Sequence, residues 1–243
     1  MANGRKAEAI GADEILKELE PLGTESYRRI LRNHGAKDPL LGVKIEELKK
    51  IAKRAKDHDL ALELYDSGVY DAQYLAGLIA DGQKMTKKDL KRWVDRANSK
   101  PICGTAVAWL AAESPFGWEL GLEWIDSKKE NTAIAGWATL SAVVSLVDDS
   151  SLDMAELKKL LVRVERTIHD QPDAVRYGMN SFVICVGCYV RDLKDIAIQT
   201  GERMGRIPVD MGDTACQVPH IPEYIRKVEK RGTIGKKKKT ARC

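Results

Sequence analysis

The stretch TAIAGWATLSAVVSLV, residues 132–147, contains sixteen residues and no charged side chain. Arranged as a helix it is apolar on almost every side, and PICGTAVAWLAA, residues 101–112, shares this property. A helix without a polar face has to be covered by neighbours on both sides. These two segments therefore predict the inner helices of a stack, and the rest of the chain should supply the helices around them.

The remaining segments are amphipathic. In KIEELKKIAKRAK, residues 44–56, and MAELKKLLVRVERTIH, residues 154–169, apolar side chains recur every three or four positions. Asp71, Thr86 and Asp153 stand where helix N-caps are expected. The pattern predicts helices over residues 12–21, 24–34, 45–56, 58–67, 71–81, 87–97, 101–112, 115–126, 131–147, 153–169, 172–190, 192–204 and 222–231.

Short connections and regular spacing favour a solenoid. Successive helix pairs begin near residues 71, 101, 131 and 172, which is typical of a degenerate HEAT or armadillo repeat. We therefore predict an all-α protein, a right-handed α-α superhelix forming one elongated curved domain, with a compact bundle as the alternative. The segment 205–220 contains helix-breaking prolines and glycines and is expected to form an ordered loop that caps the last repeat.

The charge is distributed unevenly between a long body and a short tail. Residues 226–243 hold nine lysines and arginines against one acid, so the net charge of +4 hides a body of −4. We predict a solenoid with its capping loop over residues 1–225 and a basic, flexible tail over 226–243. Such a tail attracts polyanions, although a solvated tail that only aids solubility is an equal alternative.

Composition and motifs restrict the possible functions. We find no pattern in the sequence that is typical of a secretory signal or a membrane span, so we expect a cytoplasmic protein with reduced cysteines. We also expect a monomer. Phosphate-binding, dinucleotide-binding and Gly-x-Ser-x-Gly motifs are missing, and no cofactor is expected. Cys185, Cys188, Cys216 and His220 have a spacing that could suit zinc, but SFVICVGCYV is typical of a buried helix, so no metal site is predicted.

Basic side chains occur at helical spacing on the body. Stripes of this kind can align along one face of a solenoid and follow a phosphate backbone, although a solvated helix face is an equally good interpretation of each. Trp137 lies mid-helix beside Gly136, which would allow a ligand or another backbone to approach. The basic residues are Arg28, Arg29 and Arg32, then Lys49, Lys50, Lys53 and Arg54, then Lys87, Lys88, Lys91, Arg92 and Arg96.

One segment carries a family resemblance. LLGVKIEELKKIAK, residues 40–53, resembles the Gly-Val/Ile-Lys-x-Pro-Glu-Leu-Arg segment of the DNA alkylation repair (AlkD-like) family, and the similarity extends over about residues 24–204. The resemblance implies HEAT-like repeats with a concave, positively charged channel for duplex DNA. In family members with glycosylase activity, a carboxylate, two tryptophans and an arginine in that channel support hydrolytic release of N-alkylated purines.

This sequence departs from that set of residues. The family's Ser-Trp-x-x-x-Asp stretch aligns with residues 99–104, which places Lys100 at the tryptophan and Gly104 at the carboxylate. Trp137 stands at the arginine, and Ser181 at the later tryptophan. The resemblance therefore implies a non-excising member that recognises damaged or branched DNA through its backbone.

Three functions follow, in order of preference. The first is a DNA-binding repeat protein with Lys100, Trp137, Arg176 and the tail lysines Lys236, Lys237, Lys238 and Lys239 as DNA contacts and with no assigned catalytic residue. The second is a glycosylase for N-alkylated purines with a relocated carboxylate. Its candidates are Glu113, Asp210 and Asp213. The third is a protein-interaction scaffold, which the acidic body would suit.

Overall fold

The computed structural model describes residues 10–211 and 216–242, and regular structure within these ranges is helical. The predicted helices are all present, with their ends shifted by a few residues. A π-helical turn, Cys103–Val107, joins α7 to α8 inside the predicted helix 101–112. The helices are α1 (Ala12–Leu19), α2 (Glu25–Asn33), α3 (Ile45–Arg54), α4 (His58–Asp66), α5 (Tyr70–Ile79), α6 (Lys87–Arg96), α7 (Lys100–Ile102), α8 (Ala108–Glu113), α9 (Gly117–Ile125), α10 (Glu130–Leu146), α11 (Met154–Thr167), α12 (Asp173–Tyr189), α13 (Lys194–Met204) and α14 (Ile221–Lys230).

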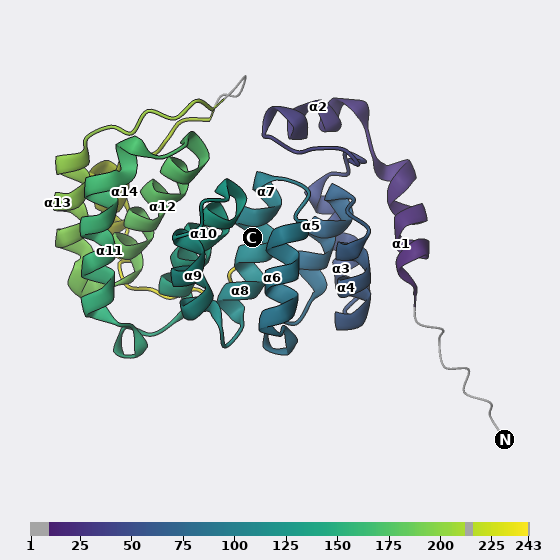
Figure 1. The fold of residues 1–243 in the computed structure, drawn as a ribbon, viewed down its shortest axis with the longest axis horizontal. Coiled ribbons are helices and arrows are strands. Elements are labelled where there is room, and N and C mark those ends of the chain that lie inside the picture. Colours follow the sequence, from purple (N-terminus) through teal and green to yellow (C-terminus); the bar gives the residue numbers. More distant parts are fainter. Residues whose placement is uncertain (1–9, 212–215, 243) are drawn as a thin grey trace.

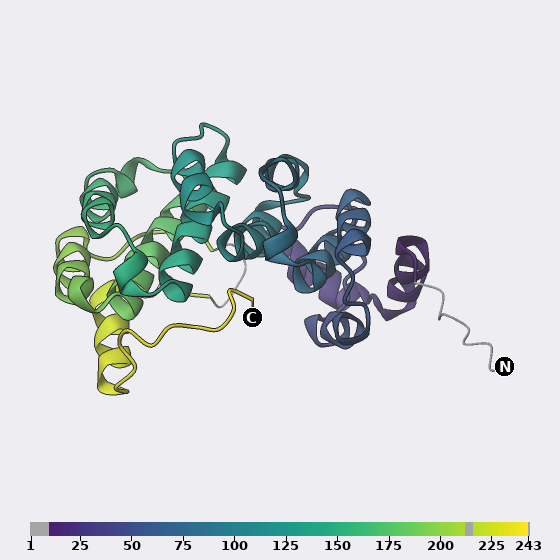
Figure 2. The same ribbon diagram turned by 90° about the horizontal axis from the view of Figure 1, so that it is seen from below.

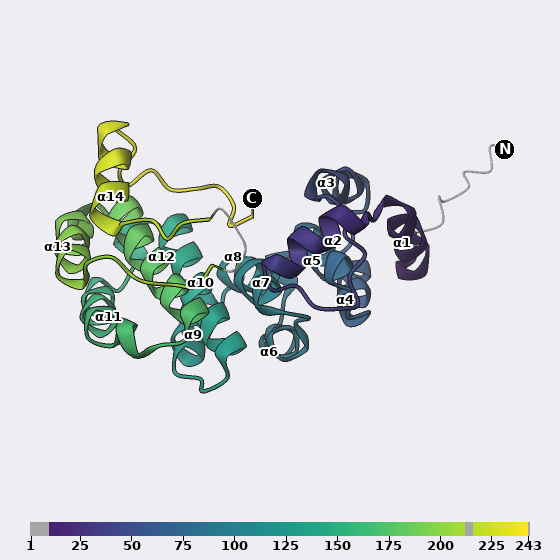
Figure 3. The same cartoon turned by 90° about the horizontal axis from the view of Figure 1, so that it is seen from above.

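The helices form two layers that bend into an arch. Helices α5, α8, α10 and α12 make the inner layer, and α4, α6, α9, α11 and α13 lie outside it (Figure 3); Figure 1 shows the same helices from the side. Figure 3 shows the arch from above, with α14 and α3 on its concave side and α6 and α9 on its convex side. The predicted all-α superhelix is confirmed, and the alternative of a compact bundle is wrong. Among the described residues, no helix combines the length and the hydropathy that a membrane crossing requires.

Helix α10 is the most enclosed element. It packs against α9, α8 and α12, and Trp137 and Leu140 are almost completely buried within it. Gly136 is required by this packing, since a Cβ atom there would lie 2.6 Å from the backbone nitrogen of Ile125 in α9. The glycine beside Trp137 therefore admits a neighbouring helix and leaves no room for a ligand.

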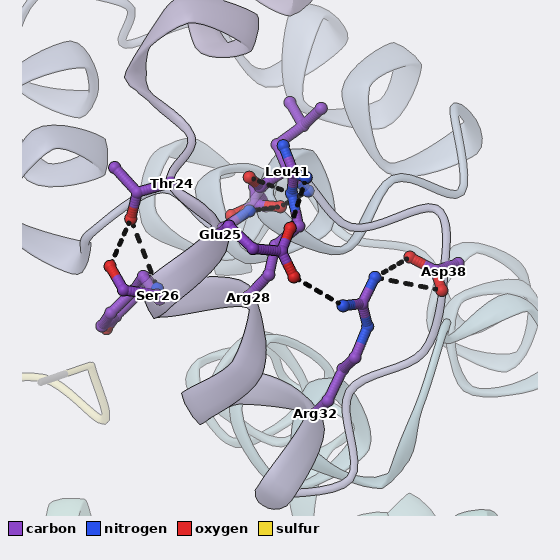
Figure 4. Close-up of polar contacts among 10 residues, drawn as sticks. Thr24, Glu25, Ser26, Arg28, Arg32, Asp38 and Leu41 are labelled. Carbon is purple, nitrogen blue, oxygen red and sulfur yellow. Dashed lines mark hydrogen bonds and ion pairs between the residues drawn. The ribbon is translucent and has the colours of Figure 1, made fainter.

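Helix α2 is attached to the arch by polar contacts and buries none of its own residues (Figure 4). Its N-cap, Thr24, accepts a hydrogen bond from the backbone of Tyr27. Arg28 Nε donates to the carbonyl of Leu41 at 2.9 Å, and Arg32 pairs with Asp38 at 3.2 Å. These bonds tie α2 to the loop that precedes α3.

That loop is in turn held by one buried carboxylate. Asp71, in the first turn of α5, is fully buried and accepts hydrogen bonds from the backbone nitrogens of Leu41 and Val43, both at 2.7 Å, and of Gly42 at 3.3 Å. Gly42 has φ +79°, where a side chain would be strained. The Leu-Leu-Gly-Val-Lys segment thus owes its shape to Asp71, which sequence analysis had assigned only as a helix cap.

Replacing Asp71 should test this account. We expect Asp71→Asn to lower the free energy of unfolding by about 2–3 kcal/mol, because an amide oxygen replaces a charged acceptor and its NH2 group faces backbone donors. Urea denaturation measures the change. Asp95→Asn is the control, because its exposed ion pair with Lys129 should contribute less than about 0.5 kcal/mol. Equal effects of the two substitutions would contradict the assignment.

Candidate nucleic-acid interface

The concave side holds a groove of about 290 Å³ whose floor is made by α10 and α12. Side chains at a spacing of three or four face it from both helices, and most of them are small, with Ile134 and Tyr177 as the exceptions. Among the described residues that line the groove, none is a carboxylate. The floor therefore offers close approach and hydroxyl groups but no acid or base. The floor residues are Ala138, Ser141, Ala142 and Ser145 from α10, and Ala174, Gly178, Ser181 and Cys185 from α12.

Gly104 extends this floor from the π-helical turn. A Cβ atom at Gly104 would meet only the Cγ2 atom of Ile134, at an ordinary contact distance of 3.7 Å. The position that aligns with the family's carboxylate is therefore open space at the edge of the groove. No backbone constraint demands glycine there, because its φ is not in the positive range.

Trp137 is a core residue, and its prediction as a DNA contact is wrong. It is 1% exposed, and its ring lies against Phe182 with 5.3 Å between ring centroids. The guanidinium of Arg163 lies 5.7 Å from the Trp137 ring centroid. A side chain that neighbours cover this completely has no surface to offer to DNA.

Lys100 and Arg176 lie together at one edge of the groove, at the N-terminal ends of α7 and α12. Lys100 pairs with Glu130 at 2.7 Å, and Arg176 pairs with Asp173. The pKa of Asp173 is lowered by the backbone N–H of Asp210, which donates at 2.9 Å, and further by Arg176 and Lys100. The two cations at this edge are thus balanced by Glu130 and Asp173, and Asp173 also fastens the loop that follows α13.

The opposite edge is formed by residues 231–242, which we call the strap. After α14 the strap crosses the C-terminal ends of the inner helices and ends beside α8 (Figure 2). The backbone nitrogen of Gly235 donates to the carbonyl of Cys188 in α12, and that of Lys238 donates to Ser145 in α10, both at 2.8 Å. Arg242 reaches the carbonyls of Leu78 and Ala80 at the end of α5.

The attachment of the strap has an electrostatic reason. Carbonyls at a helix C-terminus lack partners inside the helix and carry the negative end of its dipole, so cations and N–H donors are favourable there. Lys237, for example, donates to the carbonyl of Val144 and pairs with Asp149, both at 2.8 Å. The docked path differs from the predicted flexible tail, and the predicted boundary at residue 225 falls inside α14.

The four tail lysines thus divide into two kinds. The Lys237 side chain is 14% exposed and serves as an attachment. Lys236, Lys238 and Lys239 are exposed, and Lys238 also lines the groove. The predicted DNA contact therefore stays a prediction for Lys236, Lys238 and Lys239, whereas the side chain of Lys237 is used for attachment.

The basic stripes on the body lie on different sides of the arch. The stripe on α6 is on the convex side, where Lys87 pairs with Glu119 and Lys91 with Glu123 of α9. Residues 25–56, in contrast, hold ten lysines and arginines against four acids. Among the described residues, Arg29, Lys49 and Lys53 of this region form no ion pair. Helices α2 and α3 therefore make one end of the arch basic.

Cys103 and Cys188 are buried packing residues. Cys188 lies inside α12, and burial raises its pKa to about 12, as it does for Cys103. A thiol with so high a pKa is neutral and a poor metal ligand or nucleophile. In the part of the chain that the structure describes, no group of three or more His, Cys, Asp or Glu side chains could hold a metal ion.

Two of the three proposed relocated carboxylates, Glu113 and Asp210, lie away from the groove floor. Glu113, at the end of α8, pairs with Arg242 of the strap at 2.7 Å. Asp210 lies on the loop after α13, with its backbone bonded to Asp173. Asp213 lies outside the described residues. Neither Glu113 nor Asp210 faces the cavity in which a nucleotide could sit.

Tyr177 is a groove residue that sequence analysis missed. It lies on α12, is 39% exposed and lines the cavity beside Gly178. Exposed aromatic rings of this kind can stack on unpaired bases. The signal was present in the sequence, because Ala174, Tyr177, Ser181 and Cys185 recur at helical spacing on an otherwise bulky helix.

Comparisons with known proteins identify a family model, relatives and a solved structure that resemble this chain. A family model described as DNA alkylation repair enzyme matches residues 15–208. Uncharacterized proteins of Listeria innocua and Listeria monocytogenes are 31% and 30% identical, and each alignment covers 91% of this chain and 99% of the relative. A solved structure is 31% identical, with a TM-score of 0.87 over 96% of this chain and 100% of that one. It is described as representing a new family of proteins related to the HEAT-like repeat DNA glycosylases with affinity for branched DNA structures.

Two glycines of the inner layer should respond in opposite ways to alanine. Gly104→Ala should raise the free energy of unfolding by about 0.4–1 kcal/mol, because the site is open and alanine restricts the unfolded chain. Gly136→Ala should lower it by about 1–3 kcal/mol, because its methyl group would overlap α9. Thermal unfolding of both variants checks the pair. Destabilisation by Gly104→Ala would show that the groove edge is packed.

Proposed function

Since the chain belongs to the DNA alkylation repair enzyme family, we propose that it binds distorted or branched DNA through the sugar-phosphate backbone and excises no base. The solved relative with affinity for branched DNA supports the choice of partner. The observation that carries the proposal is the charge pattern of the groove. A floor without charged side chains lies between the ion-paired cations Lys100 and Arg176 and the exposed lysines of the strap.

This pattern suits contacts to phosphates on both sides of a nucleic acid. Lysine and arginine neutralise phosphates and release counterions, which gives affinity without reading base sequence. Small side chains on the floor let a sugar-phosphate chain approach the helices closely. Arg29, Lys49 and Lys53 would continue these contacts toward the end of the arch.

The preference for distorted DNA follows from Tyr177. A continuous duplex keeps its bases stacked inside, whereas a junction, gap or lesion leaves some of them unstacked. The exposed ring of Tyr177, in a groove that is otherwise floored by small residues, is a platform for such a base. Recognition would then depend on the shape of the DNA and on accessible base faces.

The absence of excision follows from the groove's chemistry. Cleavage of a glycosidic bond develops positive charge on the sugar, which a nearby carboxylate stabilises. Gly104 stands where the resemblance places that carboxylate, and no carboxylate lines the described groove. The missing group alone costs on the order of 3 kcal/mol, about a hundredfold in rate. By the same resemblance the family's two tryptophans and its arginine are replaced as well, by Lys100, Ser181 and Trp137.

DNA binding should be strongly salt-dependent, and the strap should account for part of this dependence. We expect the combined variant Lys236→Gln, Lys238→Gln, Lys239→Gln to make the log-log salt slope for a four-way junction shallower by up to about 2.7, since each neutralised phosphate contributes about 0.9. Fluorescence anisotropy at several salt concentrations measures the slope.

A triple substitution of Lys87, Lys88 and Lys91 to Gln is the control, because it removes the same charge from the convex side. Equal slopes for the two triple variants would contradict the proposed location of the interface. Failure of the unmodified protein to bind any duplex or junction at low salt would favour a protein-interaction scaffold instead.

Base excision can be tested directly. With enzyme in excess over DNA that carries methylated purines, the unmodified protein should release no methylpurine above the spontaneous rate, because its groove lacks the stabilising carboxylate. Chromatography of the released bases measures this. Release that depends on the protein would instead establish the glycosylase alternative.

A further inference from the structure

The end of the strap sits in a specific socket. Glu113 accepts hydrogen bonds from Thr240 Oγ1 at 2.5 Å, from the backbone nitrogen of Ala241 at 2.9 Å and from Arg242 Nη2 at 2.7 Å. The same guanidinium donates to the carbonyls of Leu78 at 2.8 Å and Ala80 at 2.7 Å. Arg242 thereby joins the ends of α5 and α8 to a segment more than 120 residues away along the chain.

The socket is mostly shielded from solvent. The side chains of Arg242 and Glu113 are 20% and 19% exposed. A paired charge at this depth is held by several acceptors, and removal of either member leaves the other unpaired in a poorly solvated site. The contact is thus more specific than the attraction of a basic tail to an acidic surface.

A second attachment lies in the middle of the strap. Lys237 points inward to Val144 and Asp149, while its neighbours Lys236 and Lys238 are exposed. In an extended chain successive side chains point to opposite sides, so an inward Lys237 turns both neighbours outward. The ammonium of Lys238 also lies 5.5 Å from the ring centroid of Tyr189. With both ends fastened, Lys236 and Lys238 are held on the outer side of the strap, and the exposed Lys239 follows them directly in the chain.

We propose that Glu113 and Arg242 are positioning residues for the DNA interface, a latch that fixes Lys236, Lys238 and Lys239 along the edge of the groove. The inference rests on the proposed function. Fixed lysines can meet phosphates only where the DNA has the matching shape, whereas mobile lysines meet the phosphates of any duplex. The latch is therefore a source of the preference for branched over linear DNA.

The proposal makes a prediction opposite in sign to simple electrostatics. Glu113→Gln removes a negative charge beside a DNA-binding edge, and charge alone would strengthen binding to every DNA. If Glu113 acts through the latch, the substitution instead frees the strap and lowers the affinity for the junction. The affinity for linear duplex should stay nearly constant, because the lysines remain on the protein.

The experiment compares Glu113→Gln with Glu119→Gln in the full chain. Glu119 is an exposed acid that pairs with Lys87 on the convex side, so the control removes the same charge away from the groove. Anisotropy gives the ratio of the dissociation constants for linear duplex and four-way junction. We expect this ratio to fall roughly three- to tenfold in Glu113→Gln, which is typical of residues that act on a site without touching its ligand, and to stay constant in the control.

A DNA-free measurement separates this inference from the proposed function. The strap should resist trypsin at Lys236, Lys238 and Lys239 in the unmodified protein and be cut rapidly in Glu113→Gln. Arg242→Gln should behave like Glu113→Gln, and Arg242→Lys should give intermediate protection and an intermediate ratio, because it keeps the charge without the two-armed geometry. These two variants provide the test if Glu113→Gln does not fold.

The outcomes are distinct. A released strap together with a lost junction preference supports the proposal. A released strap with an unchanged preference for the junction overturns the proposal. A released strap with stronger junction binding also overturns it, because the strap would then inhibit binding in the groove. If the unmodified protein binds no DNA while the strap is protected, the proposed function fails and the latch is purely structural, so the positioning role falls as well.

Discussion

The close packing of inner helices on both sides is the constraint on which the structure depends. Helix α10 touches α8, α9 and α12, so residues that face its neighbours have to fit between backbones. Gly136 admits α9, and Gly121 of α9 in turn lies against Leu140. Because these faces of an inner helix pack against neighbouring helices, only one narrow face of each inner helix is directed to the concave side. That narrow face carries the small residues of the groove.

Helix ends explain the distribution of charge around that groove. An inner helix that is enclosed along its length still has unsatisfied backbone groups at both ends. Acids occupy the N-terminal ends, with Asp71 on α5, Glu130 on α10 and Asp173 on α12. The strap brings cations and N–H donors to the C-terminal ends. One electrostatic rule therefore organises both edges of the concave side.

This arrangement connects stability to recognition. The strap satisfies carbonyls that the fold would otherwise leave to solvent, and in doing so it holds its remaining lysines beside a floor that has no charge. The lysines are attractive to a polyanion, and among the described residues that line the groove none is a carboxylate. The chain thus has the architecture of its repair family, and the proposed binding by shape rests on these two features of its groove.

The sequence alone determined the order and approximate bounds of the helices, because apolar periodicity and capping residues act over a few neighbouring positions. The family resemblance also led to the prediction that Gly104 stands at the position of the family's carboxylate. Only the tertiary structure decided that Trp137 is buried, that the α6 stripe faces the convex side and that the tail is docked. Each of these three features depends on contacts between residues that are far apart in the chain, such as Glu113 and Arg242. A local sequence pattern does not show which distant residues come into contact.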